Sequence, residues 1–137
     1  MILNASFSMR YMLFDWILDV SQIIIADIVL STSTEPEAFG RISAEASSMT
    51  KPIISTNHGG SREIIENGIT GWLVDPSDPE KLAEKILHIL ELAEEKKDLV
   101  GLNARRRVIE KFNLGQMLKK TLSVYEDLLS TKENLNN

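Results

Sequence analysis

The hydrophobic positions form short continuous runs in the first half of the chain and follow helical spacing in the second half. Short apolar runs that end in small or polar residues predict buried strands of a parallel sheet. The three runs of this kind are residues 27–33, 51–56 and 71–75. Helices are expected at residues 10–25 (with a break near 19–21), 40–49 and 61–66.

The second half of the chain reads as a series of helices. Asp78 followed by Pro79 predicts a helix start, because Asp is a good N-cap and Pro fits the first helical position. An apolar stripe at helical spacing follows. Its members are Leu82, Ile86, Ile89, Leu90 and Ala93. Further helices are expected over residues 98–112 and 116–129. Residues 1–130 are expected to form one partial domain, followed by a frayed polar tail at 131–137.

The alternation of strands and helices predicts an α/β fold, a Rossmann-like three-layer parallel sheet with a helical C-terminal tail. In such sheets ligands bind at the carboxyl ends of the strands. The segments after Ser33, Thr56 and Asp75 should therefore surround any site.

Composition and charge exclude several classes of protein. The 137 residues include 15 basic and 20 acidic ones, a net charge of −5, which argues against a nucleic-acid partner. The absence of cysteine excludes a thiol nucleophile, disulfides and a cysteine zinc site, and the two histidines show no metal-ligand spacing. The apolar stretch 11–30 carries Asp15, Asp19, Gln22 and Asp27, so no transmembrane segment is expected. These features favour a soluble cytoplasmic protein.

The segment from Ser31 to Ala46 is the best candidate for binding chemistry. A predicted strand ends in small hydroxyl residues, Glu37 follows in a loop, and Gly40 precedes a predicted helix. The free N–H groups of a helix start, together with the helix dipole, favour an anion such as phosphate. Glu45 could accept hydrogen bonds from a vicinal diol such as a ribose. The same residues are equally compatible with solvated glutamates on a surface helix.

The stretch from Glu37 to Glu45 resembles the E-x7-E element of retaining GT-B glycosyltransferases, family 4 and its relatives. Five further stretches agree in order and spacing. They are Asp27–Ser33 before the element, Pro52–Thr56 and His58–Ile65 after it, then Asn67–Val74, and Pro76–Ala83. The resemblance is strong over residues 25–95 and loose over 100–125. It implies the C-terminal, donor-binding lobe of such an enzyme.

By this resemblance Glu37 would be the catalytic residue, contacting hydroxyls of the transferred sugar. The donor-binding residues implied are Phe39 and Gly40 toward the sugar, amides of Arg41, Ile42 and Ser43 toward the diphosphate, Glu45 on the ribose, and Gly59 and Gly60 lining the cleft. The family implies hexosyl transfer from a nucleotide sugar to a glycan or lipid-linked acceptor. It implies no cofactor and no bound metal, and a place in the cytoplasm or at the inner membrane face.

The chain also departs from the family's pattern. It is expected to lack the acceptor lobe and the half-lobe that carries a basic diphosphate clamp, since Arg10 is the only basic residue before position 27. Three functions stay open: an enzyme part working with a separately encoded N-terminal lobe, a non-catalytic remnant or interaction module, and an unrelated Rossmann-like domain. The missing G-x-G-x-x-G fingerprint counts against the last.

The remaining candidates each have two interpretations. His58 is either catalytic or a loop residue with a local hydrogen bond. The helical tail is basic, and these residues form either a solvated face or a surface for an anionic partner or a membrane. They are Arg105, Arg106, Arg107, Lys111, Lys119 and Lys120. An unpaired sheet edge and an apolar last helix predict a homo-oligomer, with Trp16 at the contact.

Overall fold

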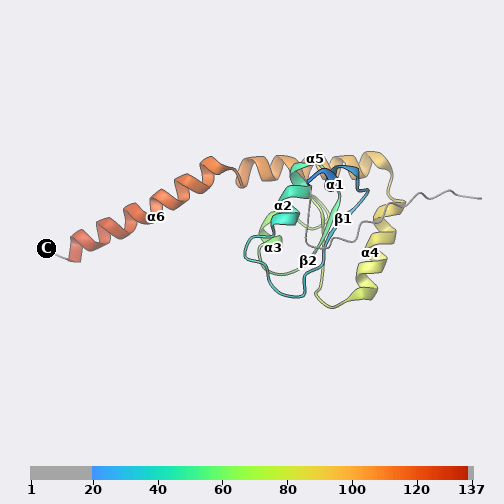
Figure 1. The fold of residues 1–137 in the computed structure, drawn as a ribbon, viewed down its shortest axis with the longest axis horizontal. Helices are drawn as coiled ribbons and strands as arrows, with labels where there is room; N and C mark the ends of the chain where they lie inside the picture. The colour runs from blue at the N-terminus through green and yellow to red at the C-terminus, as the bar shows by residue number, and fades with distance from the viewer. Residues whose placement is uncertain (1–19, 136–137) are drawn as a thin grey trace, which may run out of the picture.

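The computed structural model describes residues 20–135, in which short strands alternate with helices (Figure 1). The elements are α1 (Val20–Ile25), β1 (Val29–Ser31), α2 (Arg41–Ser48), β2 (Ile53–Thr56), α3 (Ser61–Ile64), β3 (Trp72–Val74), α4 (Pro79–Glu91), α5 (Glu94–Lys111) and α6 (Leu114–Leu135). The three strands lie within the three predicted runs. The predicted Trp16 contact lies outside the described residues.

The three strands form one parallel sheet in the order β1-β2-β3. Val29 of β1 is in register with Ile53 of β2, and Ile54 of β2 with Trp72 of β3. Because the strands are parallel and consecutive, their carboxyl ends, with the loops that follow them, meet at one edge of the sheet. Within residues 20–135, β1 has a single neighbour, so the predicted unpaired edge is present there.

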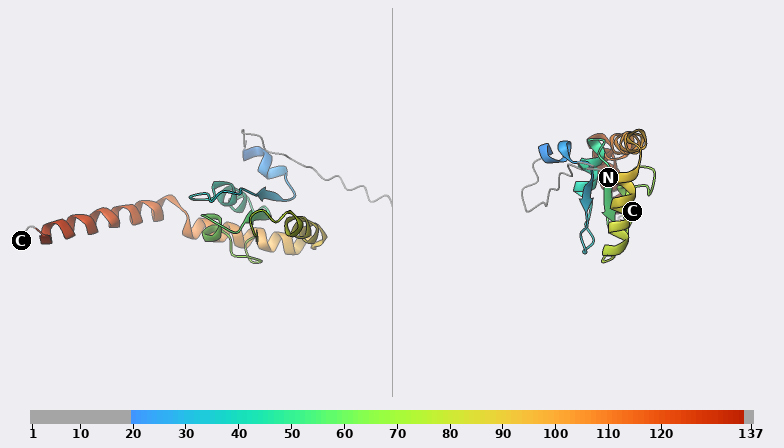
Figure 2. Two further views of the ribbon diagram at one scale, coloured as in Figure 1. Left: turned by 90° about the horizontal axis from the view of Figure 1, so that it is seen from below. Right: turned by 90° about the vertical axis from the view of Figure 1, so that its right-hand side faces the viewer.

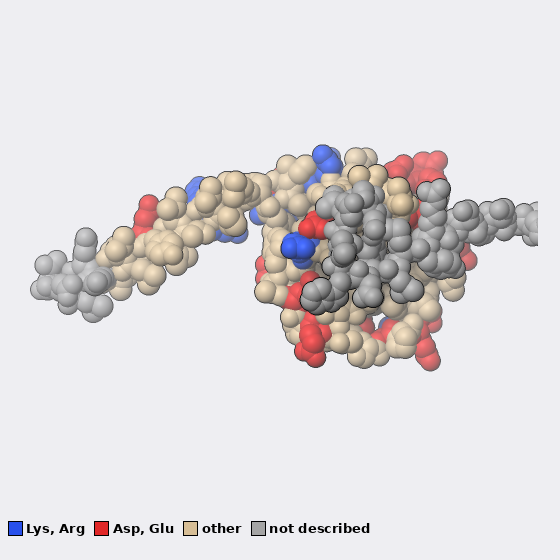
Figure 3. All heavy atoms as spheres, in the orientation of Figure 1, with Lys and Arg blue, Asp and Glu red and all other residues tan. Residues whose placement is uncertain are grey.

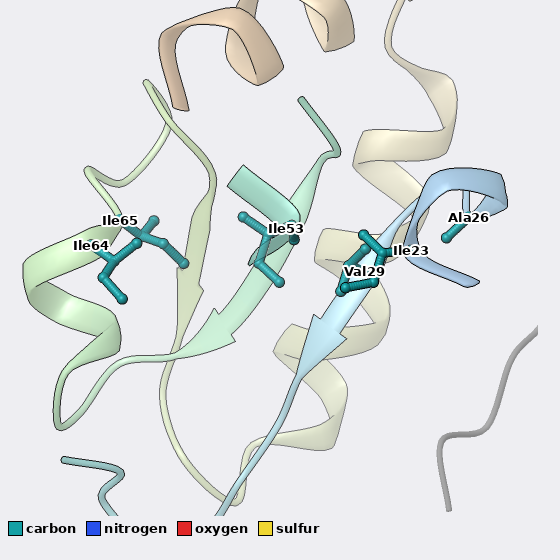
Figure 4. Packing of buried hydrophobic residues seen from close by; sticks show 7 residues of the cluster. Ile23, Ala26, Val29, Ile53, Ile64 and Ile65 are labelled. Atoms are coloured by element: carbon teal, nitrogen blue, oxygen red, sulfur yellow. The ribbon is translucent and has the colours of Figure 1, made fainter. Parts of the chain in front are cut away.

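Two apolar clusters on opposite faces of the sheet make the fold three-layered. Successive side chains of a strand point to opposite faces, so Ile53 of β2 joins one cluster and Ile54 joins the other. The first cluster packs β1 and β2 against α1, α2 and the segment around α3 (Figure 4), and its members are Ile23, Ala26, Val29, Ala46, Ile53, Ile64 and Ile65. The second packs Ile54, Trp72 and Val74 against Ile89 of α4. The predicted Rossmann-like sheet is confirmed.

Helix α5 packs against the C-terminal end of α2 and donates hydrogen bonds to carbonyls at the ends of α2 and α3. Gly101 of α5 lies so close to the carbonyl of Thr50 that an added Cβ would stand 2.1 Å from its oxygen. Arg105 donates to the carbonyl of Ser48 at the end of α2. Arg107 donates from Nε to the Ile64 carbonyl at 2.8 Å and from Nη2 to the Glu63 carbonyl at 2.9 Å. The arginine run is therefore partly structural, whereas the sequence suggested a solvated face or an anion-binding surface.

The helix boundaries in the second half differ from the sequence prediction. Helix α4 ends at Glu91, and Leu92 and Ala93 adopt extended backbone conformations. Ala93 is therefore the exposed N-cap of α5 and not part of the α4 stripe, so that prediction was wrong. Neither Gly nor Pro marks this turn, which is why the sequence placed the start of α5 four residues late. Helix α6 extends through Leu135, beyond the expected end at 129.

The predicted cap at Asp78 is confirmed, and it makes the stability of α4 depend on pH. The backbone N–H of Lys81 donates to Oδ1 of Asp78 at 3.0 Å, and Nζ of Lys81 lies 3.0 Å from Oδ2. The backbone hydrogen bond, followed by the Lys81 side chain, lowers the pKa of Asp78 below its usual value. Because the folded-state pKa is depressed, this stabilisation is present above the unfolded pKa and is lost as pH falls through the folded pKa.

We therefore expect Asp78→Asn, which keeps a capping acceptor but cannot ionise, to unfold at lower temperature than wild type at neutral pH. The difference should shrink as the pH falls through the acid range. Thermal unfolding followed by circular dichroism at a series of pH values measures it. Asp78→Ala should be less stable than Asp78→Asn at every pH, since it removes the cap as well. Melting curves that stay equally separated down to strongly acid pH would contradict this prediction.

Helix α6 leads away from the rest of the fold in every view in which its length is visible (Figures 1 and 2). Every side chain described in it, from Leu114 to Thr131, is exposed. Across residues 20–135, no helix combines the length and apolar character needed to cross a membrane.

Candidate functional site

The loops that follow β1 and β2 are joined by hydrogen bonds at the carboxyl edge of the sheet. The carbonyl of Ser33 accepts from Oγ1 of Thr56 at 2.8 Å and lies 2.9 Å from Nε2 of His58. Farther along, the carbonyl of Glu37 accepts from the N–H of Gly60 at 2.8 Å. These bonds hold the candidate loop 34–40 against the turn 57–60. The sequence prediction that both segments meet at one site is consistent with this arrangement.

Gly59 and Gly60 allow the two loops to touch backbone to backbone. A Cβ on Gly59 would lie 2.4 Å from the carbonyl oxygen of Glu37, and a Cβ on Gly60 would lie 2.3 Å from the carbonyl carbon of Phe39. Real Cβ atoms do not approach backbone this closely, so both positions need glycine. Gly60 is buried and its N–H is already bonded, so its part is to hold the loop in place.

The first turn of α2 offers unused backbone donors. Its N-cap is Gly40, in the left-handed region at φ 76°, and no side chain caps the helix. The first N–H groups of a helix have no partners within it, and within residues 20–135 no side chain caps those of Arg41, Ile42 and Ser43. Together with the positive end of the helix dipole, they favour an anion at this point.

A buried cluster of serines joins the start of α2 to β2 and to the start of α3. Ser43 is fully buried, and its Oγ donates to Oγ of Ser55 at 3.3 Å and lies 3.5 Å from Oγ of Ser61. The hydroxyl of Ser55 lies 2.8 Å from Oγ of Ser61 and 3.2 Å from the carbonyl of Ser31. The hydroxyl of Ser43 faces inward and the whole residue is buried, so Ser43 fixes the helix start on the sheet.

Glu45 and Arg41 form an ion pair one turn apart on α2. Nε of Arg41 lies 3.2 Å from Oε1 of Glu45, and the two side chains are 81% and 30% exposed. The less exposed Glu45 is the more restrained partner, and Arg41 is free to move toward a ligand. Glu37 is half-buried, and within the described residues its side chain makes no hydrogen bond or ion pair. Glu37 and Glu45 therefore do not interact directly in residues 20–135.

Phe112 contacts the candidate loop, a contact that no pattern in the sequence indicates. Its ring meets that of Phe39 edge to face, with centroids 5.8 Å apart and planes at 66°. Phe112 is the C-cap of α5. Oδ1 of the next residue, Asn113, accepts a hydrogen bond from the N–H of Gln116 in the first turn of α6. The loop is thus in contact with the junction between α5 and α6. Nothing in the local spacing of either phenylalanine shows that they meet.

His58 makes a hydrogen bond, as one of its two interpretations expected, but the partner is the neighbouring loop, 25 residues earlier in the chain. Because Nε2 faces the Ser33 carbonyl, that nitrogen carries the proton. Nδ1 is buried and has no hydrogen-bond partner among residues 20–135. This arrangement fixes the ring between the two loops and accounts for His58 structurally.

Next to β3 lies a separate open hollow of about 510 Å³. It is lined by Asn57, Asp75 and residues of α4, among them Lys81 and His88. None of the predicted donor-binding residues lines it. In the part of the chain that the structure describes, no group of three or more His, Asp or Glu side chains could hold a metal ion. The expectation that no metal is bound stays a prediction from the sequence.

Comparisons with known proteins agree with the fold. The family model for glycosyl transferases group 1 matches residues 15–107. The capsular polysaccharide biosynthesis glycosyltransferase CapM of Staphylococcus aureus is 34% identical over 100 residues, 73% of this chain and 26% of that protein.

Two solved structures extend the comparison. A glycosyltransferase from Rickettsia africae is 42% identical with a TM-score of 0.73, covering 79% of this chain and 29% of that one. HepE of Anabaena, solved in complex with UDP-glucose, is 32% identical with a TM-score of 0.68, covering 75% of this chain and 29% of HepE.

The three-layer parallel sheet, together with these structural likenesses, identifies a Rossmann-like domain of the GT-B glycosyltransferase type. The chain belongs to the glycosyl transferases group 1 family. It spans between 26% and 29% of the length of the three proteins described above.

Proposed function

We propose that this chain binds a nucleotide sugar and forms the donor-binding part of a retaining glycosyltransferase. The transferred group would be a hexosyl unit, and the acceptor a glycan or a lipid-linked molecule. The observation that carries the proposal is the first turn of α2, where Gly40 leaves the amides of Arg41 to Ser43 uncapped. The complex of the related HepE with UDP-glucose supports a uridine diphosphate donor.

In this proposal each part of the site has a distinct task. The diphosphate sits at the start of α2, where amides and the helix dipole stabilise the charge that develops as the diphosphate leaves. Glu45 accepts hydrogen bonds from the ribose diol. Arg41, released from its pair with Glu45, can turn its guanidinium toward the diphosphate. This supplies one cation to a site for which the sequence offered no basic clamp.

The sugar would lie over loop 34–40. Glu37 contacts its hydroxyls, and the amides of Phe39 and Gly40 face it. Gly59 and Gly60 hold this loop in its observed position, because both pack directly on its backbone. The proposal includes association with further chains, either a separately encoded acceptor lobe or other copies. It also places the protein in the cytoplasm, at the inner membrane face where the acceptor is lipid-linked.

Titration of the full chain with UDP-, GDP- and ADP-sugars by isothermal calorimetry tests this proposal. We expect one donor class to bind and Glu45→Ala to raise its Kd at least tenfold. The reason is that hydrogen bonds to a charged group contribute about 1.5–3 kcal/mol and tenfold is about 1.4 kcal/mol. Glu94→Ala is the matched control, since Glu94 is an exposed carboxylate paired with Lys97 on α5. It should leave the Kd unchanged.

Two results would contradict the proposal in different ways. If no nucleotide sugar binds at millimolar concentration, nucleotide-sugar binding is wrong. If a donor binds equally well to wild type and Glu45→Ala, the donor lies elsewhere on the chain. Release of free nucleotide, measured with and without co-expressed neighbouring proteins, then separates an enzyme part from a non-catalytic remnant.

A further inference from the structure

The hollow beside β3 lies on the outer flank of the sheet and is lined almost entirely by polar side chains. Within residues 20–135, β3 pairs with β2 on one side and has no neighbouring strand on the other. Of the nine residues that line the hollow of about 510 Å³, only Leu73 and Val74 are apolar. Pockets of this size that take drug-like molecules are lined mostly by apolar side chains. The lining therefore favours a ligand that is polar over most of its surface.

The formal charges around the hollow cancel. Asp75 and Glu84 supply two negative charges, and Lys81 and Lys85 supply two positive ones. Figure 3 shows acidic and basic atoms side by side at the lower edge of the domain, where α4 begins. An anion would meet the two carboxylates, and a cation would meet the two lysines. Because a hydroxyl group both donates and accepts hydrogen bonds, a neutral polyhydroxylated ligand can bond to groups of both signs.

At the carboxyl end of β3, a carboxylate is already held in position. Nζ of Lys81 lies 3.6 Å from Oδ2 of Asp75, and Nδ2 of Asn57 donates to Oδ1 of Asp75 at 3.4 Å. Both contacts are long, and the side chain of Asp75 is 61% exposed, so its oxygens can accept further hydrogen bonds. Two carboxylate oxygens can accept from both hydroxyls of a vicinal diol, the arrangement that a sugar ring presents.

Farther along the hollow, α4 supplies three groups that can face a ligand together. Glu84, Lys85 and His88 are three or four residues apart, so they share one side of the helix. None of them takes part in an ion pair within residues 20–135. On the opposite wall, Oδ1 of Asn67 accepts from the N–H of Leu73 at 3.0 Å, which leaves the amide NH₂ of Asn67 as a donor. Donors and acceptors are therefore present on both walls.

The hollow begins beside the candidate donor site. Asn57 lines the hollow and also starts the turn 57–60, which packs on the candidate loop 34–40. The N–H of Asn57 donates to the carbonyl of Val74 at 2.7 Å, which joins this turn to the end of β3. Because α4 returns alongside β3 in the opposite direction, the hollow extends from this edge of the sheet toward His88. A chain-like ligand that ends at loop 34–40 can continue into the hollow.

We propose that the hollow between β3 and α4 binds a neutral oligosaccharide stretch of the acceptor glycan. The acceptor role rests on the proposed donor-binding function, whereas binding of the saccharide itself needs no nucleotide sugar. Sugar hydroxyls bond to the carboxylates, lysines and amides of the hollow, and the C–H face of a ring packs on the half-buried Leu73. The same chain then holds part of the acceptor as well as the donor, and it prefers neutral glycans to acidic ones.

NMR titration of the full, isotope-labelled chain with three neutral trisaccharides tests this proposal. The probes are maltotriose, mannotriose and triacetylchitotriose. We expect at least one of them to shift the backbone amides of residues 73–75 and 84–88, and also those of the turn 57–60, with a millimolar Kd. Glu84→Ala/His88→Ala should raise that Kd at least tenfold, because it removes two polar groups from one wall. Both residues are exposed, so the variant should melt as wild type does.

Two control variants separate this site from other surfaces. Glu110→Ala removes an exposed carboxylate of α5 outside the hollow and should leave the Kd of the trisaccharide unchanged. Glu45→Ala should weaken nucleotide-sugar binding and leave the trisaccharide shifts as they are, because Glu45 does not line the hollow. A chain that shows these shifts but binds no nucleotide sugar would support the saccharide site and contradict the proposed donor function.

Four results would overturn the proposal. The first is that none of the three trisaccharides shifts the amides of the hollow at high concentration. The second is an equal Kd for wild type and Glu84→Ala/His88→Ala. The third is a set of shifts confined to 84–88 and absent from 57–60, which would separate the saccharide from the donor site. The last is a stronger response of the same amides to inorganic phosphate or to zwitterionic triglycine than to any trisaccharide.

Discussion

Gly60→Ala is expected to displace the candidate loop, lower stability and weaken donor binding at least tenfold. The new Cβ would stand 2.3–2.5 Å from three backbone atoms of Phe39, and backbone cannot move aside as a flexible side chain can. The loop would have to rise, breaking the hydrogen bond from the Gly60 N–H to the Glu37 carbonyl. Overpacking of this kind costs about 1–3 kcal/mol. Hydrogen exchange across residues 34–43, which needs no ligand, measures the displacement directly.

Gly68→Asn is the matched control for this substitution. Gly68 also has a left-handed backbone, but a Cβ there would meet nothing within 4 Å. Asn tolerates the left-handed conformation better than other residues with a Cβ. We expect this variant to unfold slightly earlier and to leave exchange at 34–43 unchanged. Wild-type exchange over residues 34–43 in Gly60→Ala would show that the close packing of the two loops is not needed.

Gly101→Ala is expected to destabilise the whole domain, in contrast to what helix propensity predicts. Alanine inside a helix is normally about 1 kcal/mol more favourable than glycine. Here the added Cβ would lie 2.1 Å from the carbonyl oxygen of Thr50 and 2.8 Å from its carbon. Separating α5 from the end of α2 should cost about 2–3 kcal/mol net, which lowers the melting temperature by roughly 10 °C.

Gly115→Ala provides the comparison for Gly101→Ala. Gly115 is also helical, but a Cβ there would approach only the end of the Asn113 side chain, at 3.2 Å. The melting temperature of Gly115→Ala should equal that of wild type or exceed it slightly. Thermal unfolding of the two variants side by side measures the difference. Equal or higher stability of Gly101→Ala would mean that α5 does not pack on α2 as closely as the structure shows.

The strands and the start of α4 could be predicted because their signals are local. The apolar runs around Val29, Ile53 and Trp72 are bounded by small or polar residues, and the Asp78-Pro79 pair acts on the helix that it begins. The Glu37 to Glu45 spacing likewise lies within one loop and one helix. A motif of this kind is legible in the sequence because all of its parts are neighbours along the chain.

The features that hold the site together could not be predicted because their parts are distant in sequence. Ser43, Ser55 and Ser61 lie on three elements, and only the folded sheet brings their hydroxyls together. Arg107 reaches carbonyls 43 and 44 residues earlier in the chain. Serine and arginine are common on surfaces, so no pattern around any of them distinguishes the buried or bonded ones from solvated neighbours.

The contact between Phe39 and Phe112 limits how strongly the candidate loop 34–40 and α6 can be coupled through it. Phe112 ends the helix that leads into α6, so a change in the position of α6 can reach the loop through this pair of rings. An edge-to-face pair contributes about 0.5–1.5 kcal/mol beyond its buried area. That energy corresponds to roughly two- to twelvefold in an equilibrium constant. By thermodynamic reciprocity the same ceiling applies in both directions through this contact, from the position of α6 to ligand affinity at the loop and from a bound ligand to the position of α6.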